Sequence, residues 1–287
     1  MVNVLDHIMV AVEDLEVAKK NYEKIFGLPP VWRGKHKELG TSNILFNFEN
    51  TYFELLSSAG KGLGADLVEK HINEKGEGLL GFAMGTDDIN SLRAKINDSG
   101  FSLPDLIIGE GINDHTGETR TWINQFLPPE MTRGLFSFII QHKSGVLPTV
   151  DSYSTSAIHR LDHAVIQTND PDGFIKVYRD VFGIRLALDK FIEAWKKRIL
   201  FFRINKTTIE VIEEQHANPD CHDTLWGLAW QVKDIRKTRK RLLKNNIDVT
   251  EIKAGVKDDT LVATLKSHNH NVPTLLIEST MKFISNE

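Results

Sequence analysis

The sequence predicts an α+β fold built from four copies of a βαβββ module. The main observation is a passage near the N-terminus that recurs 156 residues later, which aligns His7 with His163 and Glu54 with Glu210. Repetition at constant spacing indicates a duplicated structural unit. A second observation is the shared order within each copy, in which an alternating segment, a helical segment and further alternating segments follow one another.

The first module shows this order most clearly. Apolar residues alternate over residues 8–12, as they do in a strand with one buried face. Asp14 is a suitable helix cap and Gly27 a suitable helix end. We therefore expect a strand over 8–12, a helix over 15–26, a loop over 32–43 and strands over 43–48 and 51–56.

The module boundaries divide the chain into two halves. The modules are expected at residues 1–58, 76–146, 159–216 and 222–282. A stretch rich in Ser and Thr separates the second module from the third. The predicted domains are a first lobe over 1–146, a linker over 147–158 and a second lobe over 159–287.

Composition and charge argue against several classes of protein. The net charge of −4 is unlike that of a protein that binds nucleic acid or an anionic membrane. No apolar run of about 18 residues predicts a membrane span, and the N-terminus lacks the pattern of a secretory signal. Cys221 is the only cysteine, so we expect a loop thiol and a reducing, cytoplasmic location.

The expected partner is a small molecule, bound by a monomer or a homodimer. No nucleotide cofactor is expected, because the glycine-rich stretch 60–64 lacks the Lys and Ser or Thr that end a phosphate-binding loop. This stretch is instead expected to be a flexible connector.

Strand alternation predicts that the duplicated His and Glu share one face of a sheet. His7 and Glu54 alternate with apolar neighbours, and His163 and Glu210 do the same. An ionised carboxylate in an apolar strand is costly unless it is paired or bound to a cation. Imidazole and carboxylate together suit Zn²⁺, Ni²⁺, Fe²⁺ or Mn²⁺. The alternative is that each His is merely the hydrogen-bonding partner of its Glu.

The second and fourth modules lack the histidine. Gly81 and Gly227 stand at its position, and Gln141 and Glu278 are the expected counterparts of the glutamates. Small residues at Gly81 and Ala83 would leave volume for a ligand, and close packing of strands is the alternative.

The order, spacing and duplication of these segments resemble a known superfamily. The segments concerned are Leu5-Asp6-His7, Val12-Glu13-Asp14-Leu15, Leu39-Gly40-Thr41-Ser42-Asn43, Tyr52-Phe53-Glu54-Leu55 and Gly81-Phe82-Ala83. They are similar to the vicinal oxygen chelate superfamily, and to its glyoxalase-like branch in the first half of the chain. The resemblance implies that modules pair into two curved mixed-sheet lobes, each with a concave face that holds a divalent metal and a small substrate.

The resemblance also implies a function. It suggests a metal-dependent lyase or isomerase that transfers a proton on a small polar substrate, with Glu54 and Glu210 as catalytic carboxylates. The implied metal ligands are His7, Glu54, His163, Glu210 and Glu278. The expected substrate-binding residues are Trp32, Arg33, Thr41, Asn43, Arg120, Trp122 and Gln141.

Two alternatives remain open at the level of sequence. If neighbouring modules pair, each half is one imidazole short of a glyoxalase I-type site, which favours a metal-free protein that sequesters a drug or metabolite. If the first module pairs with the third, the duplicated His and Glu form a complete set of four ligands. Sequential pairing is favoured because neighbours in sequence usually pair in space.

Overall fold

The computed structural model describes residues 1–214 and 223–280, so that Cys221 lies outside the described residues. The first module contains β1 (Val4–Ala11), α1 (Leu15–Phe26), β2 (Trp32–His36), β3 (Thr41–Asn47) and β4 (Tyr52–Ser58). Helix α2 (Leu63–Lys75) follows. The second module contains β5 (Gly78–Gly85), α3 (Ile89–Asp98), β6 (Ile107–Asn113), β7 (Thr119–Phe126), α4 (Pro129–Thr132) and β8 (Ser137–Ser144).

The second half of the chain repeats this order. The third module contains β9 (Ile158–Thr168), α5 (Pro171–Ile175), the π-helical turn η1 (Lys176–Val181), β10 (Arg185–Ile192), β11 (Lys197–Ile204) and β12 (Thr207–Glu213). The fourth contains β13 (Thr224–Val232), α6 (Ile235–Lys244), β14 (Lys253–Ala254), β15 (Thr260–Thr264) and β16 (Thr274–Ser279). Four βαβββ modules are thus present, as predicted.

The duplication is also visible in how the module helices begin. Each of the helices α1, α3, α5 and α6 starts after an aspartate whose side chain accepts a hydrogen bond from a backbone N–H of the first turn. These capping residues are Asp14, Asp88, Asp170 and Asp234. Gly27 ends α1 in the left-handed conformation, at φ 74°, as its position predicts.

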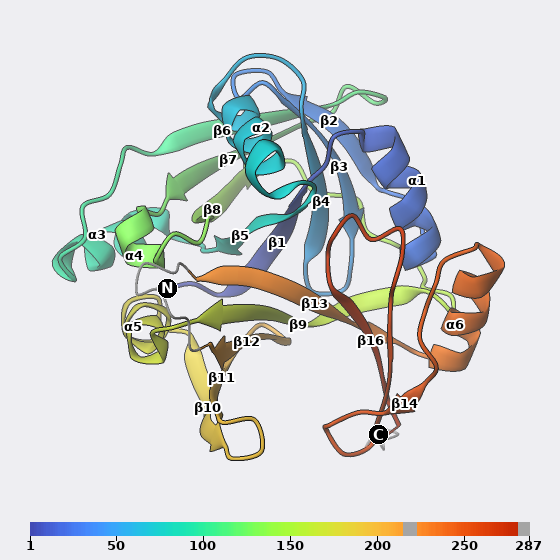
Figure 1. Cartoon of the computed structure of the whole chain (residues 1–287). Coiled ribbons are helices and arrows are strands. Elements are labelled where there is room, and N and C mark those ends of the chain that lie inside the picture. The colour runs from blue at the N-terminus through green and yellow to red at the C-terminus, as the bar shows by residue number, and fades with distance from the viewer. Residues whose placement is uncertain (215–222, 281–287) are drawn as a thin grey trace, which may run out of the picture.

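The modules pair in sequence order into two eight-stranded mixed sheets (Figure 1). The first sheet closes into a barrel in the order β1-β4-β3-β2-β6-β7-β8-β5. The second sheet is open, in the order β10-β11-β12-β9-β13-β16-β15-β14. The predicted α+β fold is therefore confirmed, and the first module does not pair with the third.

Two sequence-based expectations are wrong. The segment 32–43 is not a loop, because β2 and the first residues of β3 occupy most of it. Helix α2 was not expected beyond the glycine-rich connector, yet its apolar residues Ala65, Val68 and Ile72 recur at helical spacing and pack inwards.

The glycines of the second and fourth modules serve close packing rather than ligand volume. A Cβ at Gly81 would clash with the backbone carbonyl oxygen of Phe136. A Cβ at Gly227 would lie 3.0 Å from the carbonyl oxygen of Pro273. The strand backbone can approach this closely only where a side chain is absent.

The two sheets share one apolar core. Trp230 of β13 is buried against aromatic residues of the first module, with ring centroids 5.3 Å from Phe26 and 4.6 Å from Phe48. Buried Asn50 adds a polar link, since its side chain donates to the Leu161 carbonyl at 2.8 Å and accepts from the Leu161 N–H at 3.0 Å. No helix in residues 1–214 and 223–280 is long and apolar enough to span a membrane.

We predict that Arg241→Met lowers the free energy of unfolding by about 2 kcal/mol. The guanidinium of Arg241 in α6 donates to the carbonyls of Lys24 and Ile25, at the negative end of α1, the second at 2.9 Å. Urea unfolding measures the change. Arg236→Met on the same helix is the control, because Arg236 is exposed. An equal loss of stability in both variants would contradict a role for the hydrogen bonds between α6 and α1.

Candidate functional site

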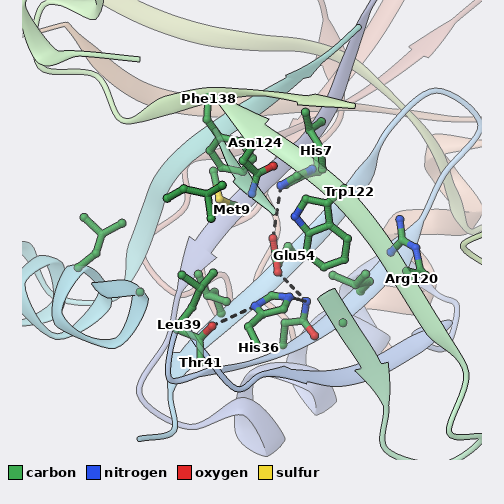
Figure 2. A pocket seen from close by; sticks show the side chains of 18 of the residues that line it. His7, Met9, His36, Leu39, Thr41, Glu54, Arg120, Trp122, Asn124 and Phe138 are labelled. Atoms are coloured by element: carbon green, nitrogen blue, oxygen red, sulfur yellow. Dashed lines mark hydrogen bonds and ion pairs between the residues drawn. The ribbon is translucent and has the colours of Figure 1, made fainter. Parts of the chain in front are cut away.

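A cavity of about 300 Å³ lies inside the first barrel (Figure 2). Most of its wall is apolar, and Leu63 and Leu67 of α2 form part of it. The polar and charged residues of the wall are His7, His36, Thr41, Asn43, Glu54, Arg120 and Asn124. A concave, mostly apolar space with a few converging polar groups is typical of a small-molecule site.

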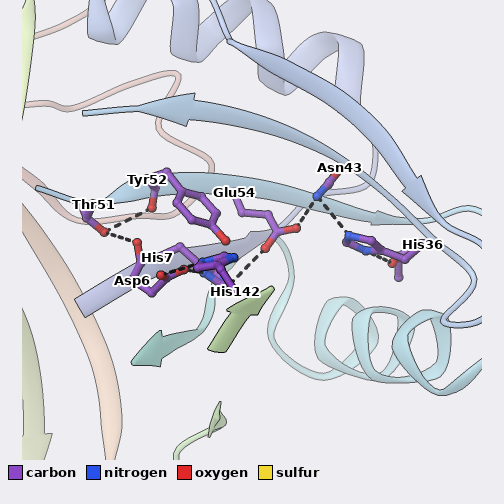
Figure 3. Close-up of polar contacts among 9 residues, drawn as sticks. Asp6, His7, His36, Asn43, Thr51, Tyr52, Glu54 and His142 are labelled. Atoms are coloured by element: carbon purple, nitrogen blue, oxygen red, sulfur yellow. Dashed lines mark hydrogen bonds and ion pairs between the residues drawn. The ribbon is translucent and has the colours of Figure 1, made fainter. Parts of the chain in front are cut away.

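A chain of polar contacts crosses the wall of this cavity (Figure 3). His7 Nδ1 lies 2.8 Å from Asp6 Oδ1, and His7 Nε2 lies 3.5 Å from Glu54 Oε2. The second oxygen of Glu54 accepts a hydrogen bond of 2.7 Å from Asn43. Tyr52 stacks on the imidazole of His7, with ring centroids 4.5 Å apart.

Both ring nitrogens of His7 therefore face carboxylate oxygens. A neutral imidazole has one N–H donor, so only a doubly protonated ring can donate towards both sides. The side chains of His7 and Glu54 are only 4% and 7% exposed, so water does not replace these contacts. The imidazole of His7 therefore bridges the carboxylates of Asp6 and Glu54.

Asp6 and His36 complete the polar surroundings. Burial alone would raise the pKa of Asp6, but hydrogen bonds from His142 and His7 outweigh it and hold the pKa well below its ordinary value. Burial lowers the pKa of His36, which favours its neutral form. The Nδ1 atom of His36 lies 3.0 Å from the hydroxyl of Thr41.

The second sheet carries the same trio in a more open setting. His163 Nδ1 lies 2.8 Å from Asp162, and His163 Nε2 lies 3.3 Å from Glu210. The side chains of His163 and Glu210 are each 18% exposed. Burial raises the pKa of Glu210, and the nearby His163 opposes this effect. His163 and Glu210 do not line the barrel cavity.

The residues present do not fit a glyoxalase I-type metal site. In each module, the residue five positions before the capping aspartate pairs with a residue of the last strand. In the first and third modules this partner is the glutamate, so the same register position can be compared in all four modules. In the first module Met9 pairs with Glu54, whereas in the second Ala83 pairs with Phe138. In the second sheet the corresponding pairs are Val165 with Glu210 and Ala229 with Leu275.

Each sheet thus offers one His and one Glu, and an apolar residue or glycine at the other two positions. The ring of Phe138 even packs edge-on against His7, at 5.6 Å. Among the described residues, no group of three His, Cys, Asp or Glu is placed to hold a metal ion.

The register also corrects the positions assigned to Gln141 and Glu278. Both lie three residues beyond the glutamate position and point to the opposite face of their sheets. Gln141 accepts from the N–H of Ile89 at the start of α3, and Glu278 accepts from the N–H of Ile235 at the start of α6. Neither residue lines the cavity.

The structure brings most of the expected substrate-binding residues together. The cavity wall includes Trp32, Thr41, Asn43, Arg120 and Trp122. Arg33 lies elsewhere, because it forms ion pairs with Glu16 and Asp114 outside the cavity. Tyr52, Asn124 and Phe138 also line the cavity, although they are not among the residues expected from the sequence. Alternation along β7 from Arg120 and Trp122 would have pointed to Asn124.

Two family models match the chain. One is described as a glyoxalase-like domain and matches residues 5–182. The chain belongs to the glyoxalase-like family. The other is described as the glyoxalase/bleomycin resistance protein/dioxygenase superfamily and matches residues 160–269 of the glyoxalase-like chain. The resemblance stated from sequence is therefore confirmed. A comparison with curated proteins finds no match.

Several solved structures share the fold of this glyoxalase-like protein. A mutant of 4-hydroxymandelate synthase from Streptomyces coelicolor has a TM-score of 0.67 at 14% identity, over 99% of this chain and 95% of that chain. The Mn(II)-bound glyoxalase from Novosphingobium aromaticivorans has a TM-score of 0.65 at 15% identity, over 98% and 84%. A hypothetical protein from Staphylococcus aureus has a TM-score of 0.64 at 12% identity, over 95% and 98%. At these identities the similarity establishes the fold alone.

We predict that Asp6→Asn lowers the free energy of unfolding at pH 7 by about 1–3 kcal/mol, because Asp6 accepts hydrogen bonds from two histidines. The pKa of Asp6 is lower in the folded than in the unfolded chain. Its contribution is therefore complete above about pH 4 and is lost as the pH falls towards the folded pKa. Urea unfolding at pH 7 and pH 3 should show a smaller difference between wild type and variant in acid.

Asp162→Asn is the matched control for this prediction. The Asp162 side chain is 27% exposed, against 10% for Asp6, so its loss should matter less. A pH-independent effect of Asp6→Asn would contradict the account given for its pKa.

Proposed function

We propose that this protein is a small-molecule enzyme that transfers a proton at Glu54 inside the first barrel. The observation that supports it best is the buried His7, whose two nitrogens face the carboxylates of Asp6 and Glu54 at the wall of an apolar cavity. Buried titratable groups that face one another at the wall of a cavity are typical of acid–base catalysis.

Each member of the trio has a separate role in this proposal. Glu54 Oε2 accepts a proton from the substrate, while Asn43 holds Oε1 in place. His7 donates from Nε2 to the charge that develops on the substrate, and Glu54 then returns the proton to the product. Asp6 orients the imidazole and stabilises its protonated form. The apolar wall strengthens these interactions because it excludes water.

The proposed chemistry is isomerase- or lyase-type, and it does not depend on a bound metal. The Novosphingobium aromaticivorans glyoxalase is Mn(II)-bound, but the second module here supplies Gly81 and Phe138 at the positions where a four-ligand site needs donors. A cation held by His7 and Glu54 alone would lack the remaining protein ligands of such a site.

A metal-free binding protein is the second candidate. The apolar wall and the cover formed by α2 favour it, since they would hold a drug or metabolite without any reaction. The two candidates differ in one property, because a binding protein needs no proton acceptor at Glu54.

We expect Glu54→Gln to reduce proton transfer by about 10²–10⁴-fold, the usual contribution of a positioned acid or base. The assay incubates the protein in D₂O with 2-hydroxy ketones and 2-oxo acids and follows deuterium uptake beside the carbonyl by NMR. Glu210→Gln is the matched variant on the second sheet, and its exchange rate should stay close to wild type.

Three results would count against the proposal. Deuterium exchange that persists in the Glu54→Gln variant would show that Glu54 is not the base. Exchange lost in Glu210→Gln alone would move the reaction to the second sheet. Binding of these compounds without any exchange above the uncatalysed rate would favour the binding protein.

A further inference from the structure

We propose that the barrel cavity takes a small carboxylic acid with an apolar, ring-sized body, and that Arg120 binds its carboxylate. The inference rests on the proposed function only in placing the reactive part of the acid beside Glu54. Three features of the cavity support it: a guanidinium that is buried without a counter-ion among the described residues, an apolar wall, and the ring of Tyr52, which contacts both Arg120 and His7.

Arg120 is a buried cation without a carboxylate partner in the described part of the chain. It is 7% exposed and lines the cavity, and it forms no ion pair within residues 1–214 and 223–280. Its Nε atom has no hydrogen-bond partner. Arg133, another arginine with a largely buried side chain, pairs with Asp223. An unpaired buried charge is costly, so the site is built for an anion that arrives with the ligand.

The surroundings of Arg120 fix the kind of anion. The guanidinium lies 5.6 Å from the ring centroid of Trp32 and 5.6 Å from that of Tyr52. Contacts with aromatic rings occupy the guanidinium without using its N–H donors, which stay available for hydrogen bonds. A planar fork of N–H groups matches a carboxylate, which accepts two parallel hydrogen bonds.

The remaining wall residues determine the size and polarity of the ligand's body. Met9, Trp122, Phe136, Phe138 and Ile140 line the cavity and offer apolar surface. A cavity of about 150 Å³ holds benzene, so about 300 Å³ suits a ring with a short acid side chain. An extended polar ligand such as a sugar phosphate would leave many of its groups without partners.

The orientation follows from Tyr52, whose ring contacts both ends of the site. It stacks on His7 at 4.5 Å and lies 5.6 Å from the Arg120 guanidinium. The carboxylate is repelled by Glu54 and attracted by Arg120, so the acid binds with its charge on the Arg120 side of this ring. Its apolar body then extends along the cavity towards Glu54.

The test measures equilibrium binding of phenylacetate by isothermal titration, with phenylacetamide as the neutral analogue and acetate as the analogue without a ring. Wild type should bind phenylacetate at least about tenfold more tightly than either analogue. Arg120→Gln should lose that preference for the acid. Arg120→Lys keeps a charge but not the planar fork, and should recover part of it.

Arg33→Gln is the matched control, because Arg33 lies on the same first barrel but is paired outside the cavity. It should bind phenylacetate like wild type. Thermal unfolding with and without phenylacetate provides a second readout: the ligand should raise the Tm of wild type and Arg33→Gln, but not of Arg120→Gln. A folded Arg120→Gln variant is identified by its cooperative unfolding.

Several results would overturn this inference. They are equal binding of the acid and the amide to wild type, unchanged acid binding in Arg120→Gln, or no binding of phenylacetate at 10 mM, a concentration about tenfold above a weak, millimolar Kd. Because binding needs no chemistry at Glu54, it is separable from the proposed function. Arg120-dependent binding together with exchange that survives Glu54→Gln would support the ligand class and reject the reaction.

Discussion

The seam between β2 and β6 converts a curved sheet into a closed barrel. Its strand pairs are Gly34 with Asn113 and Lys35 with Ile112, and the N–H of Asp114 donates to the carbonyl of Arg33 beside them at 2.9 Å. Glycines beside the seam make room for tryptophans, because a Cβ at Gly34 would clash with the indole of Trp32 and one at Gly109 with that of Trp122. Both tryptophans line the cavity. Closure of the sheet and the shape of the ligand space therefore depend on the same few residues.

The two halves show what closure changes. Each has an Asp–His–Glu trio with similar distances, on equivalent strands. In the closed barrel the trio is buried beside an apolar cavity, and a buried carboxylate interacts more strongly with its neighbours than an exposed one. In the open sheet the same trio is partly exposed to solvent. Duplication copied the residues, whereas the surrounding strands determine their environment.

Much of the fold was predictable from the sequence, because it depends on local signals. The range of α1, its cap at Asp14 and its end at Gly27 follow from neighbouring residues. The pairing of His7 with Glu54 followed from strand alternation together with the duplication. Helix α2 was not predicted, although the spacing of its apolar residues is typical of a helix.

The residues opposite His7 were less predictable, since they depend on how strands align. The sequence suggests Gln141 as the counterpart of Glu54, but the strand register places Phe138 there, and an offset of three residues reverses the face of the strand. The ligand-binding role proposed for Arg120 depends on contacts between distant strands. The domain boundaries, the cytoplasmic location, and the monomeric or homodimeric state stay predictions.

The aromatic core around Trp230 has a consequence for how the molecule holds together. Phe26 and Phe48 belong to the first half, and Trp230 belongs to the second. A chain cut between the halves would expose these rings to water and leave Asn50 without the Leu161 backbone. We therefore expect that neither half folds on its own and that the whole molecule melts in a single cooperative transition. A protein with only one of these sheets would have to cover this surface in another way, for which a dimer of two identical copies is the simplest arrangement.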